Sequence, residues 1–177
     1  MDKVLKPLLI LLSAYIAGLV LYKVTTLKLE HLKNNPTNYY NSITLNERER
    51  QLECLAKNIY YEAAKEPFEG KVAVAQVTLN RVESGIFPED ICKTIYQKNV
   101  VFDRVICQFS WYCERDTIRK PLHKDSYDEC YAVAKKVLLE GFRLDSLKEA
   151  LYYHANYVSP GWKKQKIATI GNHIFYK

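Results

Sequence analysis

The sequence has little of what marks disordered, fibrous or zinc-binding chains. Only 6 of its 177 residues are glycine and 48% are hydrophobic, so the chain can bury a core and is neither disordered nor fibrous. It has no Cys-x-x-Cys pair and no close cluster of cysteine and histidine, which argues against a zinc site. It has no internal repeat and no motif that reads DNA or RNA. The length fits one domain with an appendage rather than two ordinary domains.

The positive charge is spread too thinly to indicate a nucleic-acid partner. The net charge is +6, from 26 Lys and Arg against 20 Asp and Glu, and residues 1–33 carry half of that surplus. The remainder is therefore only mildly basic, and we expect no nucleic-acid binding.

An apolar run opens the chain. Residues 4–22, with lysines at both flanks, reach the length needed to span a hydrocarbon core of roughly 30 Å. Residues 1–24 are therefore predicted to be a signal anchor or a secretory signal peptide, and the lack of a small-x-small cleavage site favours the anchor. Residues 25–46 are polar and without period, which predicts a tether, and residues 47–177 are the predicted domain. We expect that domain outside the cytoplasm, on the periplasmic or extracytoplasmic side, either anchored to the membrane or secreted.

Five cysteines fit an exported domain. They predict one or two disulfides with at least one free thiol, and the sequence leaves the pairing open. The cysteines are Cys54, Cys92, Cys107, Cys113 and Cys130.

The first helix of the domain carries a carboxylate on its apolar face. A capping box at Thr44 and Glu47 predicts the start, and apolar residues at three- and four-residue steps continue it to about Glu66, before a proline. At 100° per residue Glu62 lies only about 20° from Leu55 around the axis. Burial and the helix dipole both favour the protonated carboxyl that a general acid needs. The alternative is a Glu at the edge of the stripe, held by a Lys or Arg.

Two further helices are predicted over residues 70–82 and 128–139. Gln76 and Asn80 lie one turn apart on the first of these helices, so they either line a polar groove or satisfy buried backbone groups. The loop Cys107–Cys113 and the segments 152–162 and 170–176 mix aromatic side chains with amides, hydroxyls and histidines. Such surfaces bind polar ligands with apolar faces, such as sugar rings.

Six motifs in register resemble the SleB/CwlJ-type cell wall hydrolases, the family of the spore-cortex-lytic enzymes. Their order and spacing cover nearly the whole chain from about Leu52. The motifs are Tyr61-Glu-Ala-Ala-Lys-Glu-Pro67, Leu79-Asn-Arg81, Phe87-Pro-Glu-Asp-Ile-Cys92, Cys107-Gln-Phe-Ser-Trp-Tyr-Cys113, Tyr153-His-Ala155 with Pro160-Gly-Trp162, and Ile170-Gly-Asn-His-Ile-Phe-Tyr176.

The resemblance implies a mainly α domain with at most a small sheet, lysozyme-like or lytic-transglycosylase-like, behind an N-terminal membrane helix. It implies action on the glycan strands of peptidoglycan, with Glu62 as the catalytic residue and Glu66 in support. The sequence departs from the family pattern where Ala64 and Lys65 replace an Arg-Gly pair, and where Glu114-Arg115 replaces an Asp-Gly pair. The missing arginine leaves open how a nearby charge or substrate group is held.

One carboxylate suffices for a lytic transglycosylase that cleaves the MurNAc–GlcNAc bond, because the 6-hydroxyl of the muramic acid attacks its own anomeric carbon. No metal or organic cofactor is required. Substrate contacts are expected from Glu66, Gln76, Asn80, Gln108, Ser110, Trp111, Tyr153, His154, Trp162 and His173. Two rivals stay open: a cysteine amidase or endopeptidase with Cys107 as nucleophile and His154 as base, and an inactive membrane-tethered glycan-binding module.

Overall fold

The structure is a computed structural model that describes residues 15–26 and 44–177. The chain divides into two units, Met1–Ser42 and Ile43–Lys177. In the first unit, residues 15–26 form a helix with exposed side chains. No helix within the two described ranges is long and apolar enough to cross a membrane. Residues 4–14 of the predicted anchor and residues 27–43 of the predicted tether lie outside the described residues, so both remain predictions.

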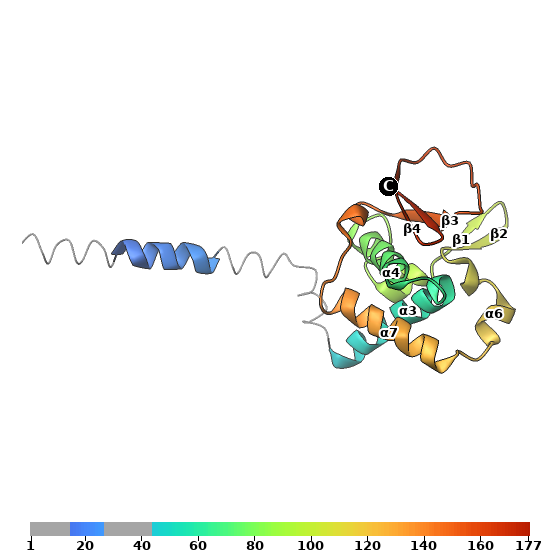
Figure 1. Ribbon diagram of the computed structural model, residues 1–177, viewed down its shortest axis with the longest axis horizontal. Coiled ribbons are helices and arrows are strands. Elements are labelled where there is room, and N and C mark those ends of the chain that lie inside the picture. Colours follow the sequence, from blue (N-terminus) through green and yellow to red (C-terminus); the bar gives the residue numbers. More distant parts are fainter. Residues whose placement is uncertain (1–14, 27–43) are drawn as a thin grey trace, which may run out of the picture. The chain divides into compact units, whose positions relative to one another are not determined.

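Three helices form the body of the second unit: α3 (Leu45–Ala63), α4 (Phe68–Glu83) and α7 (Lys124–Leu138) (Figure 1). All three predicted helices are thereby confirmed. Thr44 caps α3, since its hydroxyl accepts a hydrogen bond from the Glu47 amide at 3.2 Å. The helix ends at Ala63, three residues before the predicted end, because the chain must extend ahead of Pro67, which opens α4.

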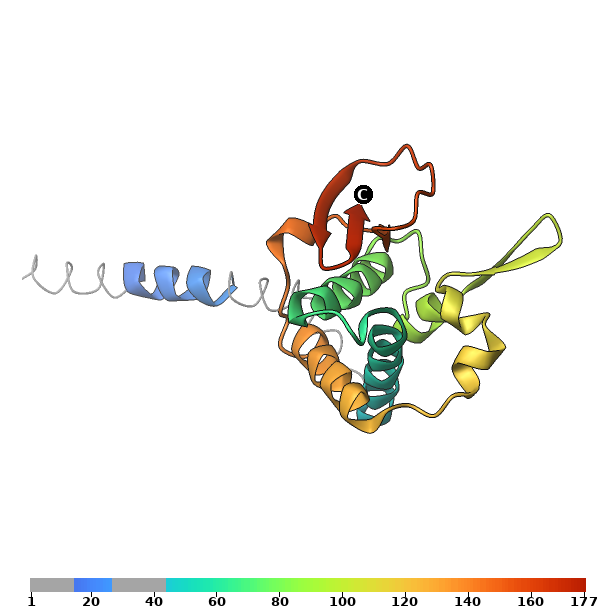
Figure 2. The ribbon, with the colours of Figure 1, turned by 45° about the vertical axis from the view of Figure 1, so that its right-hand side comes forward.

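Shorter elements connect these helices. They are α5 (Ile91–Ile95), the 3₁₀ helix η1 (Ser110–Tyr112), α6 (Arg115–Arg119) and the 3₁₀ helix η2 (Asp145–Leu147). Between α5 and η1, the antiparallel hairpin of β1 (Lys98–Val101) and β2 (Arg104–Cys107) projects away from the helices (Figure 2). Its tip is apolar and open to solvent, with Phe102 95% exposed.

A second sheet closes the domain. It contains β3 (Tyr152–Ala155), β4 (Lys166–Ile170) and β5 (His173–Tyr176) in the antiparallel order β3-β5-β4. Phe175 of the central strand is fully buried and packs with Ala73 and Val77 of α4. The domain is therefore mainly helical, as predicted, but it has two small sheets where at most one was expected. Tyr153 of β3 packs against the same cluster.

Two disulfides brace the domain. Cys54–Cys92 joins α3 to α5, and Cys107–Cys113 closes the loop around η1, while Cys130 is free and buried. Two bridges and one free thiol agree with the prediction. No group of three metal-ligating side chains occurs among the residues that the structure describes.

Candidate active site

Glu62 lies in the last turn of α3, where β3 approaches this helix. Its side chain is half-buried, and the Tyr153 hydroxyl donates a hydrogen bond to its Oε2 at 2.9 Å. Burial raises the pKa of Glu62, and the charge of Glu114 adds to that rise, while the bond from Tyr153 and the charge of Arg81 oppose it. The raised pKa agrees with the prediction from the helical wheel. A carboxyl of this kind can give up a proton and take it back near neutral pH.

Arg81 of α4 is a cation whose charge acts on Glu62. The sequence did not predict it as a site residue. Its side chain is buried, its Nε donates to the Leu151 carbonyl at 2.8 Å, and its guanidinium lies 5.4 Å from the ring centroid of Phe87 and 5.0 Å from that of Phe109. Burial lowers its pKa, and the charge of Glu62 acts against that change. The rings and the backbone bond fix the guanidinium, so its positive charge stabilises the ionised form of Glu62.

A cleft of 630 Å³ opens beside Glu62. The disulfide-closed loop after β2 supplies one part of its lining, and β3 with the loop that follows supplies another. Predicted site residues in the lining are Glu62, Gln108, Ser110, Trp111, Tyr153, His154, Trp162 and His173. The structure therefore brings together eight of the eleven residues predicted from sequence. Unpredicted members include Arg81, Glu114, Thr117, Tyr152 and Tyr157.

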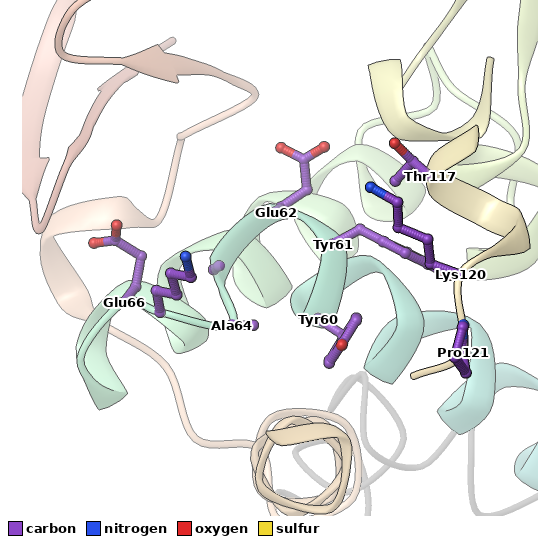
Figure 3. A pocket seen from close by; sticks show the side chains of 10 residues that line it. Tyr60, Tyr61, Glu62, Ala64, Glu66, Thr117, Lys120 and Pro121 are labelled. Carbon is purple, nitrogen blue, oxygen red and sulfur yellow. The ribbon is translucent and has the colours of Figure 1, made fainter. Parts of the chain in front are cut away.

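A second cavity, of 580 Å³, lies on the other side of Glu62. The two cavities share Tyr61, Glu62 and Thr117, so the carboxyl lies where they join. Figure 3 shows the Glu62 carboxyl standing clear of α3, with Thr117 and Lys120 on the facing segment. Both volumes fall within the range of about 300–1,000 Å³ found for small-molecule sites. An extended ligand that passes Glu62 can fill both.

A family model described as Cell Wall Hydrolase matches residues 65–176. The chain belongs to this family. The match begins three residues after Glu62, so it covers the cleft walls but not the carboxylate. It includes every other predicted site residue.

Curated relatives and solved structures agree with the family. The spore cortex-lytic enzyme of Oceanobacillus iheyensis is 31% identical over 132 residues, which are 73% of this chain and 42% of the relative. That of Bacillus subtilis strain 168 is 30% identical over 128 residues, 70% of this chain and 36% of the relative. The matched region thus spans less than half the length of these relatives.

Two solved structures of catalytic domains share the fold of this cell wall hydrolase. The domain of SleB from Bacillus cereus gives a TM-score of 0.51 at 26% identity, covering 73% of this chain and 91% of that one. The catalytic domain of the germination-specific lytic transglycosylase SleB from Bacillus anthracis gives 0.55 at 26% identity, covering 77% and 98%.

The aromatic side chains that line the cleft of this cell wall hydrolase differ in how exposed they are. Trp111 is buried, stacks on Tyr61 at 4.4 Å and donates from Nε1 to Asn58 at 3.0 Å, so it mainly supports the wall. Trp162 is 42% exposed and meets His154 edge-on at 5.5 Å. Trp162 and the more exposed Tyr157, at 86%, are therefore the aromatic side chains of the cleft that are available for stacking on a sugar ring.

Gln76 and Asn80 do not line the main cleft. Gln76 donates to the Leu144 carbonyl at 3.1 Å and accepts from the Leu144 amide at 2.7 Å. Asn80 donates to the carbonyls of Leu147 and Ala150 at 2.8 and 2.9 Å. The polar-groove interpretation is corrected accordingly: these amides satisfy buried backbone groups of the segment leading into β3.

Glu66 lines the second cavity, and its carboxylate binds Asn172. Its two carboxylate oxygens accept hydrogen bonds from the amide nitrogen and from the side chain of Asn172, each at 2.9 Å. Burial acts to raise the pKa of Glu66, but these two bonds outweigh it and the pKa is lowered. The ionised carboxylate therefore ties the end of α3 to the turn between β4 and β5.

The structure contradicts the interpretation of Cys107 as a nucleophile with His154 as its base. The Cys107 sulfur is bonded to Cys113, so it is not a thiolate. Both His154 ring nitrogens are engaged, by the Tyr176 hydroxyl and the Ala155 carbonyl, each at 2.9 Å. The one free thiol, Cys130, is buried, which raises its pKa to about 11.

Proposed function

We propose that this chain cleaves the glycosidic bond between MurNAc and GlcNAc in peptidoglycan as a lytic transglycosylase, with Glu62 as both acid and base. The observation that carries the proposal is the half-buried Glu62 carboxyl, with a raised pKa, at the junction of two cavities. A glycosidic oxygen is flanked by a sugar on each side, so its acid must lie between two sugar sites. Membership of the cell wall hydrolase family supports the same substrate.

The reaction needs only protons and one nucleophile. Protonated Glu62 donates its proton to the oxygen that leaves the anomeric carbon of MurNAc, and the C1–O bond breaks through an oxocarbenium-like state. The 6-hydroxyl of the same sugar then forms a bond to C1, and the Glu62 carboxylate takes up the proton of that hydroxyl. The products are a 1,6-anhydro end and a free GlcNAc end. Tyr153 and Arg81 stabilise the carboxylate between the two steps.

A second candidate reaction is hydrolysis, which Glu114 favours. Its side chain lines the same cleft as Glu62, is exposed, and accepts a hydrogen bond from Thr117 at 3.0 Å. A second carboxylate can activate water or trap the glycosyl centre. Hydrolysis leaves reducing ends instead of anhydro ends, so the products separate the two reactions.

The setting of the domain is also a proposal. We infer that residues 47–177 act on the extracytoplasmic side, behind an anchor or signal in residues 1–24 and a tether in residues 25–46. Two disulfides in the domain fit an oxidising compartment. Peptidoglycan is the substrate in that compartment, and no nucleic acid or cofactor takes part in the proposed reaction.

Mass spectrometry of fragments released from purified sacculi tests the function. We expect anhydro-MurNAc ends from the wild-type chain, a loss of at least about 10³-fold in Glu62→Gln, and anhydro ends still produced by the matched control Glu114→Gln. Reducing ends that disappear in Glu114→Gln would establish hydrolysis. Sacculus binding without any released fragment would establish a glycan-binding module.

A further inference from the structure

We propose that the second cavity binds a carboxylate carried by the muramic acid substituent of the glycan strand, through Lys65 and Lys120. The inference rests on the proposed glycan-cleaving function and adds a charge preference to it. The cavity of 580 Å³ is lined by Lys65 and Lys120 together with Glu62 and Glu66. The other lining residues, Tyr60, Tyr61, Ala63, Ala64, Thr117 and Pro121, carry no charge.

The two lysines reach the cavity from separate segments. Lys65 follows the C-terminal end of α3, and Lys120 directly follows α6. Both are exposed, and within the described part of the chain no ion pair engages either ammonium. Figure 3 shows Lys120 extending along Thr117 toward the side of the cavity where Glu62 lies. Two lysines without an ion-pair partner in the described residues thus line one open cavity.

The two carboxyls of the cavity do not neutralise this charge. Both oxygens of Glu66 accept hydrogen bonds from Asn172, which directs that carboxylate to the turn after β4. Burial raises the pKa of Glu62, so Glu62 is biased toward its neutral form. The cavity is therefore positive overall, and the complementary ligand is an anion.

The substrate supplies such an anion at a defined place. Muramic acid carries a lactyl group. Without a stem peptide this group ends in a free carboxylate. With a stem peptide the lactyl carboxyl is bonded to the peptide, which has carboxylates of its own. A strand lying across Glu62 places one sugar in each cavity. The inference places the muramic acid in the second cavity, with its substituent beside Lys65 and Lys120.

Steady-state cleavage of three soluble strand preparations tests the inference: strands with stem peptides, strands stripped by an amidase, and stripped strands whose lactyl carboxylates are converted to neutral amides. We expect Lys65→Gln/Lys120→Gln to raise KM about 5- to 30-fold on carboxylate-bearing strands, with kcat nearly unchanged, and to leave KM on the amidated strands as in wild type. Lys65→Arg/Lys120→Arg retains the low KM. Lys93→Gln, an exposed lysine of α5 that lines neither cavity, serves as control.

The three strand preparations also identify the source of the anion. A rise in KM on stripped strands alone assigns the lactyl carboxylate, and a rise on peptide-bearing strands alone assigns the peptide carboxylates. A rise on both shows that the two lysines accept either carboxylate, and each of these three outcomes supports the inference. An unchanged KM, an equal rise on amidated strands, or a fall in kcat alone overturns it. If wild type cleaves no strand, the proposed function fails, and affinities measured by calorimetry decide the inference. Equal affinity of wild type and the double glutamine variant for stripped strands then refutes it.

Discussion

Gly171→Ala tests how the end of α3 is held to the C-terminal sheet. Gly171 lies in the turn between β4 and β5 with φ +56°, and a Cβ there would lie 2.0 Å from Oε2 of Glu66. No rotation of the methyl group relieves that contact, so the Glu66 carboxylate must leave its place. It then loses both hydrogen bonds from Asn172.

The expected loss of stability in Gly171→Ala is the sum of two contributions. An alanine in the left-handed region costs about 1–2 kcal/mol, and each hydrogen bond to an ionised carboxylate contributes about 1.5–3 kcal/mol. The displaced carboxylate can turn toward the second cavity, which it lines, where water replaces part of what is lost. We therefore expect the free energy of unfolding to fall by about 3–5 kcal/mol. At roughly 3–4 °C per kcal/mol, Tm falls by about 10–20 °C.

Urea unfolding followed by circular dichroism measures the loss. Gly161→Ala is the matched control, since Gly161 has φ +66° and nothing within 4 Å of its would-be Cβ, so only the backbone contribution of about 1–2 kcal/mol applies. In a Glu66→Ala background, Gly171→Ala is expected to cost no more than this control. The reasoning is refuted if Gly171→Ala and Gly161→Ala destabilise the wild-type chain equally.

Three further perturbations probe the site. Tyr153→Phe removes a hydrogen bond to Glu62 that is stronger to the carboxylate than to the neutral acid by about 1–1.5 kcal/mol. The alkaline limb of the kcat/KM pH profile is therefore expected to move up by about one pH unit. Tyr152→Phe, the control, leaves the limb in place, and an unmoved limb in Tyr153→Phe contradicts the assignment. Burial raises the folded-state pKa of Glu62 above its unfolded value, so wild-type stability falls as pH rises through that window. Glu62→Gln is therefore expected to be more stable than wild type at pH 7 by about 0.5–2 kcal/mol. Thermal unfolding measures this difference, which disappears below about pH 4. Equal Tm values of the two proteins at pH 7 argue against a buried carboxylate. Replacing Cys107 and Cys113 by serine opens a loop of sequence separation 6 and is expected to lower the free energy of unfolding by about 2 kcal/mol. The KM for glycan strands is expected to rise as well. An unchanged KM shows that the disulfide does not shape the cleft.

The helices could be predicted because their determinants are local. Apolar steps of three and four residues mark α3, α4 and α7, and the capping residue Thr44 is adjacent to the helix that it caps. The early end of α3 and the early start of α7 at Lys124 were missed. Both ends depend on turn geometry that hydrophobic period does not specify.

The residues of the candidate active site could be predicted from the sequence only where they lie in a local motif. Glu62 shares the apolar face of a single helix, and its angular position can be worked out from the chain alone. Arg81 and Glu114 come to the same cleft through the packing of α4 and the loop after η1. Gln76 and Asn80 share a face as predicted, but a segment about 70 residues further along the chain covers that face. Their task is therefore set by long-range packing and not by spacing.

The strand order β3-β5-β4 has a consequence for how the molecule is made. The middle strand, His173–Tyr176, is the last of the three in the chain and the only one that pairs with both others. Neither β3 nor β4 has a sheet partner until that strand has been synthesised, so Tyr153 reaches Glu62 only late in folding. A nascent chain that ends before residue 173 carries every predicted site residue except His173, but β3 has no sheet partner in it. The cleft beside Glu62 is thus completed only after residues 173–176 have been synthesised.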